Sequence, residues 1–292
     1  MTPVHDLHDP VGAVVQAAVQ SDGWVLDVDG CLVRTARAGG MGGRPIDGAA
    51  DLLRWLRRHG KPFIVCTNAS QRTAAQYAAH LRELGLDVRD GELMTAATAS
   101  AAHVARAHPG EPVLVLGDEG LADAMRAEGV TVVEGDSPRP GVVVVGAADR
   151  YTTAALNAAC LAVADHGAAF YVTVDTPWFH GGLGKSVCVS SAIAHAIAGI
   201  TGRQPVVSGK PSPALGAVLR DQLGGDTQRL VVVGDVASIE IRLAHLMGAL
   251  GVLVLSGGTA AADVPALPAE HTPHLCVDDV GALFREMAAL AP

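Results

Sequence analysis

The sequence predicts an α/β protein built on buried parallel strands. Hydrophobic residues make up 49% of the 292 residues but aromatic residues only 3%, so Val, Leu, Ile and Ala must build the core. Short runs of Val and Leu without polar alternation are typical of strands covered on both faces, as in parallel sheets. Segments with helical spacing separate these runs, and the 34 glycines suit the turns between them. The length allows one large domain or two of ordinary size.

Strands and helices are expected to alternate in three series along the chain, because apolar runs alternate with segments of helical period. The first series comprises a leading helix at 10–21, strands at 24–26 and 62–66, and helices at 49–59 and 71–84. The second comprises strands at 112–116, 130–134, 141–145 and 169–174 and helices at 96–107, 120–128, 153–164 and 190–201. The third comprises a helix at 213–223, strands at 229–233 and 251–255, an edge strand at 271–277 and a helix at 279–290. We therefore expect an α/β domain at 95–205, inserted into a domain formed by 1–94 and 206–292.

Two carboxylates follow the first strand. Asp27 and Asp29 are separated by one residue and precede Gly30. Residues two apart on a strand point to the same side, and two bare carboxylates that close repel each other. A divalent cation held by carboxylate oxygens removes this repulsion, as does a proton on one of them. The alternative is an acidic turn, since Asp-Gly is a common turn pair.

Polar groups also follow two other predicted strands. Thr67 and Asn68 follow the strand at 62–66, and Asp235 follows the strand at 229–233. If these strands are parallel neighbours, their carboxyl ends meet at one edge of the sheet, where ligands bind in such folds. Lys210, in the short segment that leads back from the inserted domain, is expected to join them. Thr67 can also be read as an ordinary helix cap.

Together these residue types fit the transfer of a phosphoryl group. Asp27 and Asp235 offer oxygen ligands to magnesium, while Lys210 and Thr67 offer positive charge and a hydroxyl to phosphoryl oxygens. Asp27 has an oxygen to attack phosphorus as a nucleophile. Asp29 is placed to protonate the leaving oxygen and then to deprotonate water, a role commonly worth about 10²–10⁴ in rate.

The chain resembles the haloacid dehalogenase superfamily. Its segments DVDGCL at 27–32, TNAS at 67–70, GKP at 209–211 and GD at 234–235 match the four motifs of that superfamily in order and approximate spacing. Segments at 45–49, 143–150 and 201–205 are similar to subclass IIA, which includes 4-nitrophenyl phosphatase-like and phosphoglycolate phosphatase-like enzymes. The resemblance covers residues 20–290 and implies a Rossmann-like parallel-sheet core with an inserted α/β cap of the C2 type.

The resemblance also implies a magnesium-dependent phosphatase that hydrolyses a small phosphomonoester through an aspartyl-phosphate. The implied roles are nucleophile and metal ligand for Asp27, general acid/base and backbone metal ligand for Asp29, phosphoryl binding for Thr67, Asn68 and Lys210, and metal binding for Asp235. The second aspartate, Asp29, separates the chain from the dehalogenases of the superfamily, which lack it.

Two regions depart from the family pattern. Glu240 stands where the family usually has aspartate, and its arm is longer by about 1.5 Å. We expect it to act from the outer shell of the metal through water; the alternative is a solvated residue at a helix start. In the cap, we expect Asp175, Trp178 and His180 to contact a substrate with both apolar and anionic parts. Packing into the core is the alternative for Trp178 and its neighbour Phe179.

Composition narrows the partners and the compartment. The net charge is −9 and no basic block is present, which argues against a nucleic-acid partner. The longest apolar stretch, 246–255, is interrupted by glycines and too short to span a membrane. Five scattered cysteines without CxxC spacing are expected to be reduced thiols, which indicates a cytoplasmic location. We expect a small phosphorylated metabolite as partner, and a homodimer formed through the cap, as is frequent in the branch that the chain resembles.

Two other functions stay open. The protein is alternatively a phosphometabolite-binding or regulatory protein with little or no turnover, or a phosphotransferase that passes the phosphoryl group to an acceptor other than water. Among phosphatase substrates, a sugar phosphate, a glycerol phosphate, a nucleotide and phosphoglycolate are all compatible with the sequence.

Overall fold

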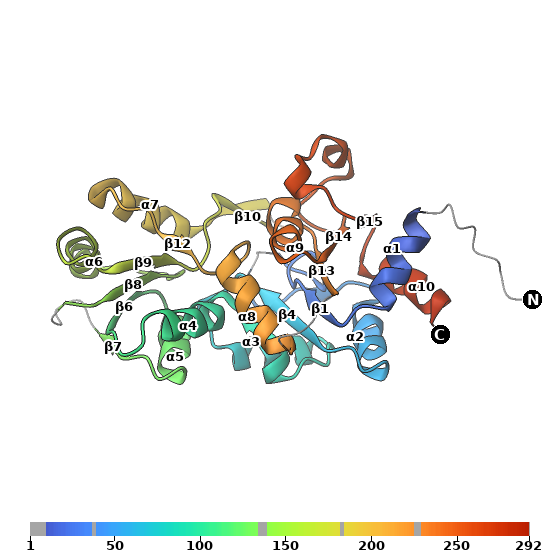
Figure 1. Cartoon of the computed structure of the whole chain (residues 1–292), viewed down its shortest axis with the longest axis horizontal. Helices are drawn as coiled ribbons and strands as arrows, with labels where there is room; N and C mark the ends of the chain where they lie inside the picture. The colour runs from blue at the N-terminus through green and yellow to red at the C-terminus, as the bar shows by residue number, and fades with distance from the viewer. Residues whose placement is uncertain (1–9, 37–38, 134–138, 182–183, 225–228, 292) are drawn as a thin grey trace, which may run out of the picture.

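Two parallel sheets, each covered by helices, lie side by side along the long axis of the molecule (Figure 1). The computed structural model describes residues 10–36, 39–133, 139–181, 184–224 and 229–291. The first sheet takes strands from both ends of this range, and the second takes them from the middle. The predicted α/β class, with a second α/β unit between two parts of the first, is confirmed.

The first sheet has six strands, and all of its pairings are parallel. Their order is β15-β14-β13-β1-β4-β5. Their bounds are β1 Gly23–Leu26, β4 Phe63–Thr67, β5 Leu93–Thr95, β13 Leu230–Gly234, β14 Leu250–Val254 and β15 Leu275–Val277. Since β1 lies between β13 and β4, the three strands expected to carry polar groups are indeed neighbours.

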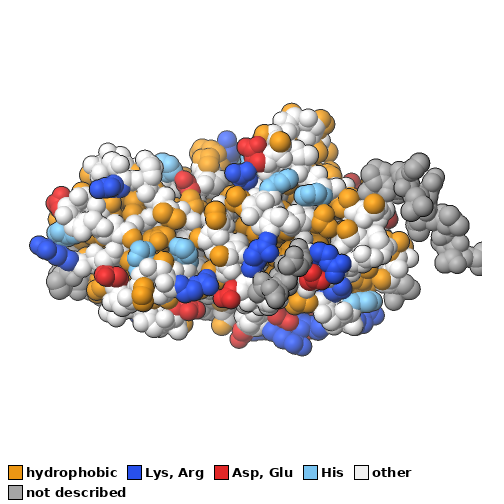
Figure 2. Space-filling model, viewed as in Figure 1, with side chains coloured by type: hydrophobic (Ala, Val, Ile, Leu, Met, Phe, Trp, Pro, Cys, Tyr) orange, Lys and Arg blue, Asp and Glu red, His pale blue; other side chains and the backbone are white. Residues whose placement is uncertain are grey.

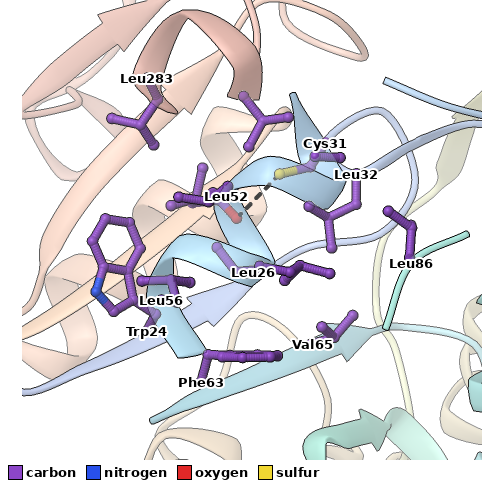
Figure 3. Packing of buried hydrophobic residues seen from close by; sticks show 14 of the residues in the cluster. Trp24, Leu26, Cys31, Leu32, Leu52, Leu56, Phe63, Val65, Leu86 and Leu283 are labelled. Atoms are coloured by element: carbon purple, nitrogen blue, oxygen red, sulfur yellow. Dashed lines mark hydrogen bonds between the residues drawn. The ribbon is translucent and has the colours of Figure 1, made fainter. Parts of the chain in front are cut away.

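Helices cover both faces of this sheet, because alternate residues of each strand point to opposite sides. Trp24 and Leu26 of β1 pack on one side against Leu52 and Leu56 (Figure 3), while Val25 packs on the other. The first side is covered by α1 (Pro10–Val19), α2 (Ala49–Arg58), α3 (Ala74–Glu83) and α10 (Val280–Leu290). The second side is covered mainly by α8 (Pro213–Leu223) and α9 (Arg242–Met247).

The start of α3 is fixed by a capping box. Thr73 Oγ1 accepts a hydrogen bond from the Gln76 backbone N–H at 3.2 Å, and Gln76 Oε1 accepts one from the Thr73 backbone N–H at 3.0 Å. This reciprocal pair satisfies two backbone donors that the first helical turn leaves free. The helix therefore begins at Ala74, three residues after the predicted start, and residues 68–73 form a loop beside the end of β4.

The second sheet has five parallel strands in the order β12-β9-β8-β6-β7. Their bounds are β6 Val113–Leu116, β7 Val132–Val133, β8 Val142–Val145, β9 Ala169–Val172 and β12 Val206–Val207. One face packs against α6 (Thr153–Asp165) and α7 (Val189–Thr201), and the other against α4 (Ala96–Ala107) and α5 (Glu119–Ala127). The sheet thus has its own core.

The chain crosses between the sheets at two neighbouring points. It leaves the first sheet at β5, which runs directly into α4, and it returns after β12. The hydroxyls of Ser100 on α4 and Ser208 after β12 are buried and lie 2.6 Å apart. We retain 95–205 as the proposed cap, although β12, just past this boundary, pairs with β9 of the second sheet.

Two short hairpins complete the strands. Strands β10 (Trp178–Gly181) and β11 (Gly184–Val187) pair antiparallel and were not predicted, and β2 (Val33–Arg34) pairs antiparallel with β3 (Arg44–Pro45). Short 3₁₀ turns are η1 Asp90–Glu92, η3 Ala261–Ala266 and η4 Ala269–His271.

Acidic and basic side chains are interspersed over the face shown in Figure 2, without gathering into one continuous patch of either sign. Within the described ranges, no helix combines the length and the apolarity that crossing a bilayer requires. All five cysteines are free thiols.

Candidate active site

The carboxyl ends of β1, β4 and β13 border a cavity of about 310 Å³ between the two sheets. Nearly all of the predicted site residues line it: Asp27, Asp29, Thr67, Asn68, Lys210, Asp235, Glu240, Trp178 and His180. Asp175, predicted to contact substrate, is not among the lining residues.

Lys210 is the centre of the charged floor of this cavity. Its side chain is buried, and Nζ lies 2.5 Å from Asp27 Oδ1, 3.0 Å from Glu240 Oε1 and 2.8 Å from the Cys66 carbonyl oxygen. Burial alone would lower the pKa of the ammonium, but Asp27 and Glu240 outweigh it and raise the pKa well above its ordinary value. Lys210 therefore stays charged. Asp27 and Lys210, separated by 183 positions in the sequence, meet as the motifs predict.

Asp29 is held by the loop that follows β2. The hydroxyl of Thr35 donates to Asp29 Oδ1 at 2.7 Å, and the backbone N–H of Gly39 donates to Oδ2 at 2.9 Å. Burial and then the nearby Asp27 carboxylate raise the pKa of Asp29 to about 6, against these two hydrogen bonds. Asp29 can therefore carry a proton near neutral pH, as a general acid must.

Thr67 and Asn68 have different surroundings. Thr67 Oγ1 accepts a hydrogen bond at 3.2 Å from the Ala69 backbone N–H, which leaves its own hydroxyl proton available for a ligand. The Asn68 amide instead binds the backbone of Lys210 twice: Oδ1 accepts from the Lys210 N–H at 2.9 Å, and Nδ2 donates to the Lys210 carbonyl at 3.0 Å. The side chain of Asn68 thus positions Lys210.

Asp235 is enclosed by glycine backbone. Its Oδ2 accepts a hydrogen bond of 2.5 Å from the Gly258 N–H. A Cβ atom on Gly30 or Gly257 would overlap the Asp235 carboxylate, and Gly30 also has a φ of +85°. Burial, followed by Asp27 and Glu240, raises the pKa of Asp235 well above its ordinary value. The Asp-Gly pair that follows β1 is therefore more than a surface turn.

Glu240 is buried, so the alternative of a solvated residue is wrong: its exposed fraction is 3%. It lies in a π-helical turn (Ala237–Ile241), a rare geometry that is frequent at functional sites. Glu240 Oε2 accepts a hydrogen bond of 3.1 Å from the Val236 N–H, while Oε1 faces Lys210. Burial raises the pKa of Glu240 to about 7, although Lys210 opposes this shift.

The donor set of the floor fits a divalent cation. No group of three or more His, Cys, Asp or Glu side chains is arranged to hold a metal ion in the described part of the chain. Magnesium, however, needs only one or two carboxylates and keeps several waters. If Asp27, Asp235 and Glu240 are all ionised, they carry three negative charges against the single ammonium of Lys210, an excess of two, and without a further cation this crowding raises the pKa of Asp235 and of Glu240. This excess matches one divalent ion.

The second sheet and its hairpin form the roof of the cavity. Trp178 and His180 of β10 line it, and 44% of Trp178 is exposed, so packing into the core is the wrong alternative for this residue. For Phe179 both alternatives hold: it lines the cavity, and it also packs in the core beside Val174 and Cys188. The Asp175 carboxylate accepts a hydrogen bond of 2.7 Å from the Ser191 hydroxyl on α7, which explains its absence from the lining.

The loop after β4 also contacts the second sheet directly, which the sequence did not predict. The Ala147 N–H donates to Ser70 Oγ at 3.0 Å, and the Gly120 N–H donates to the Gln71 carbonyl at 3.1 Å. Gln71 Nε2 donates to Asp118 Oδ2 at 3.1 Å. Ser70 lies in the TNAS motif and Ala147 in the segment 143–150, but the sequence did not indicate that they contact each other, because the partners are far apart along the chain.

Acidic residues and a lysine at the strand ends of a parallel sheet, beneath a second α/β unit, define a hydrolase of the haloacid dehalogenase type. Comparison with known families agrees. Residues 24–131 match the family described as haloacid dehalogenase-like hydrolase, and residues 207–283 match the family described as HAD-hydrolase-like.

The chain belongs to the haloacid dehalogenase superfamily, in subfamily IIA, and is a phosphatase for small phosphate esters. It is 30% identical over 285 residues to chronophin of Rattus norvegicus, a match that covers 94% of this chain and 90% of the relative. The structure of 4-nitrophenylphosphatase from Thermotoga maritima is 25% identical, with a TM-score of 0.82 and coverage of 92% of this chain and 98% of that one. Glycerol phosphate phosphatase from Mycobacterium tuberculosis, solved with magnesium, is 28% identical, with a TM-score of 0.81 and coverage of 94% and 79%. Phosphatases of this superfamily use magnesium.

Proposed function

We propose that the chain hydrolyses a small phosphomonoester through an aspartyl-phosphate formed on Asp27. The observation that carries this proposal is the buried contact of 2.5 Å between Lys210 Nζ and Asp27 Oδ1 at the edge of the cavity. This contact uses one carboxylate oxygen, and we assign the attack on phosphorus to the other, Oδ2. Lys210, the Thr67 hydroxyl and the Asn68 backbone N–H are the groups that we assign to the phosphoryl oxygens.

The reaction has two steps. In the first, Asp27 Oδ2 forms a bond to phosphorus, the bond between phosphorus and the ester oxygen breaks, and Asp29 gives its proton to that oxygen. In the second, Asp29 takes a proton from a water whose oxygen attacks phosphorus; the bond to Asp27 breaks and inorganic phosphate leaves. A pKa of about 6 for Asp29 supports both roles near neutral pH.

We assign a bound magnesium ion to Asp27, Asp235 and the backbone carbonyl of Asp29, with Glu240 acting through water. The ion, when bound, would supply positive charge to the phosphoryl oxygens. The pairing of Glu240 with Lys210 supports an indirect role for this residue. Trp178 and His180 remain proposed substrate contacts, whereas the hydrogen bond of Asp175 to Ser191 supports a role in shaping the loop before β10.

Phosphate release from 4-nitrophenyl phosphate, measured with and without magnesium, tests the proposal. We expect release by the wild type with magnesium and none above background by Asp27→Asn, because an amide is a poor nucleophile. Asp118→Asn is the matched control, since this acid follows β6 of the second sheet and lies outside the cavity lining. Unchanged turnover in a folded Asp27→Asn protein, with its thermal midpoint retained, would exclude the mechanism. Dimerisation through the cap and a cytoplasmic location are retained as separate proposals.

A further inference from the structure

The roof of the cavity differs from its floor in charge. Four acids, Asp27, Asp29, Asp235 and Glu240, lie on the floor, and Lys210 is the sole Lys or Arg among the described lining residues. Lys210 already forms ion pairs with two of these acids, so its charge is not available to an anionic group of the leaving alcohol. The roof and the side wall are mainly apolar, formed by Pro177, Trp178 and Phe179 before and in β10 and by Val236 and Ile239 after β13.

We propose that the natural ester carries its phosphate on an uncharged alcohol with an apolar ring, and that a second anionic group on the leaving group is rejected. This inference rests on the proposed phosphatase function. Lys210 and the proposed magnesium ion are both engaged by the floor acids and the phosphoryl group, so a second carboxylate or phosphate near the roof would have no Lys or Arg of the described lining to pair with it, which costs free energy. An apolar ring instead removes its surface and that of Trp178 from water. The volume of about 310 Å³ suits one small ring beside the phosphoryl group.

The hydroxyls of the roof argue against a polyol such as a sugar. Thr176 Oγ1 already donates to the Trp178 carbonyl at 3.3 Å, and Ser190 Oγ donates to the Val174 carbonyl at 3.3 Å. A polyol needs a partner for each hydroxyl that it buries. Of the described polar side chains outside the floor, His180 and Ser238 have no hydrogen bond and Ser70 only accepts one, so they can serve a few polar groups but not every hydroxyl of a sugar.

Lys185 is a cation close to the roof, but it lies outside the lining. It pairs with His180 across the hairpin, and its Nζ lies 4.8 Å from the centroid of the Trp178 ring. The ring faces of indoles attract ammonium groups, so this contact holds the charge on the ring instead of in the cavity. Lys185 therefore provides a direct test of whether anionic leaving groups find a partner.

Phosphate esters of simple alcohols can distinguish apolar, polyol and anionic leaving groups. Their leaving groups are all weakly acidic alcohols, so differences in rate report on the cavity and not on the ease of expelling the leaving group. We expect kcat/KM for 2-phenylethyl phosphate to exceed that for glycerol 3-phosphate and for the phosphate ester of 3-hydroxypropanoate by about tenfold or more. Equal or faster hydrolysis of either polar ester would overturn the inference and leave the phosphatase function intact. If neither these esters nor 4-nitrophenyl phosphate is hydrolysed, the proposed function fails; the same ranking is then measured as affinity for Asp27→Asn by calorimetry, where equal affinities overturn the inference.

Variants of roof residues test whether Trp178 is responsible for the preference for an apolar ring. Trp178→Ala is expected to lower kcat/KM for 2-phenylethyl phosphate by about tenfold and to change that for glycerol 3-phosphate by less than about twofold. Val187→Ala is the matched control, because Val187 pairs with Trp178 across the hairpin, is 51% exposed and does not line the cavity. An equal loss on both esters in Trp178→Ala contradicts the inference.

Variants that add or remove a positive charge near the roof test whether an anionic leaving group lacks a partner there. Ser238→Arg places a cation in the wall and is expected to raise kcat/KM for the 3-hydroxypropanoate ester by about tenfold. Lys185→Ala is expected to leave all three esters unchanged. Loss of turnover on the anionic ester alone in Lys185→Ala would show that the leaving group does find a cation there, and would overturn the proposal.

Discussion

The two parallel sheets share one construction, but their strand ends differ. In the first sheet, β1 and β13 lead into Asp27 and Asp235, which are buried beside Lys210. In the second sheet, β6 leads into Asp118, whose carboxylate accepts a hydrogen bond from Gln71 and does not line the cavity. Because both sheets direct strand ends toward the same region, the architecture alone does not determine the chemistry. The surroundings of each acid do.

Burial explains this difference. Asp27, Asp235 and Glu240 are at most 7% exposed, so their charges must be balanced within the protein. Asp118 is only partly buried, and a single hydrogen bond with water nearby suffices for it. The acids proposed to react or to bind metal thus differ from Asp118 by being buried together with little compensating charge, more than by their position at a strand end.

The largest expected effect is on the general acid. Asp29→Asn should lower kcat for 2-phenylethyl phosphate by about 10²–10⁴, because its alkoxide leaving group needs a proton. The loss should be smaller for 4-nitrophenyl phosphate, whose leaving group is stable as an anion. Asp118→Asn should stay within about threefold of the wild type on both esters. Equal losses on the two esters in Asp29→Asn would contradict the assigned role.

Removal of the central cation should destabilise the floor. Lys210→Met leaves Asp27 and Glu240 buried without their partner, and we expect the metal-free protein near pH 7 to lose about 3–5 kcal/mol of unfolding free energy. Lys185→Met, on the exposed hairpin, should change it by less than about 0.5 kcal/mol. Urea unfolding measures the loss of stability in both variants. Similar midpoints for the two would contradict the expectation that the floor lysine stabilises the fold more than the lysine of the exposed hairpin.

The stability of the metal-free protein should fall as pH rises. The pKa of Asp29 is raised from 3.8 to about 6 and that of Glu240 from 4.5 to about 7, so the native state binds more protons than the unfolded state across this window. The stabilisation is therefore complete below about pH 4 and is lost as pH rises through about 7, on the order of 3 kcal/mol for each of the two carboxyl groups.

Urea unfolding with a chelator at about pH 5 and about pH 7.5 checks the sign of this dependence. Magnesium should restore stability mainly at the higher pH, where the carboxylates are charged. A metal-free protein that becomes more stable from the lower to the higher pH would contradict the expected balance of charges.

The smallest of these effects concerns the position of Lys210. Asn68→Ala removes two hydrogen bonds to the Lys210 backbone, each worth about 0.5–1.5 kcal/mol, so kcat/KM should fall by about tenfold. Gln71→Ala removes the hydrogen bonds from Nε2 to Asp118 at 3.1 Å and to Asp149 at 3.4 Å, neither of which involves Lys210, and should change kcat/KM by less than about threefold. A larger loss in Gln71→Ala than in Asn68→Ala would reverse the comparison.

The sequence predicted the strands that position the site, because β1, β4 and β13 are continuous apolar runs that end in polar residues. It also predicted that Asp27, Thr67, Lys210 and Asp235 would meet. It missed β5, which has only three residues and runs without a break into α4. It also missed the β10–β11 hairpin, since Trp178 to Gly181 has no alternation of apolar and polar residues.

The finer roles of the site residues were beyond the reach of sequence patterns. Asn68 binds the backbone of a residue 142 positions away, a contact that local spacing does not encode. Glu240 is buried within a π-helical turn, a local geometry that helical spacing in the sequence does not reveal. These features depend on tertiary contacts, so they became visible only with the fold.

Gly234, the last residue of β13, lies directly against the side chain of Glu240. A Cβ atom there would overlap the side chain of Glu240, so the longer acid is accommodated by the absence of a side chain on its neighbour. An alanine at 234 would demand a shorter acid at 240, and a shorter acid alone would leave an unfilled volume beneath Lys210. A side chain at 234 is thus incompatible with the longer acid at 240, and an engineer who wishes to keep Glu240 must keep the glycine at the end of the strand.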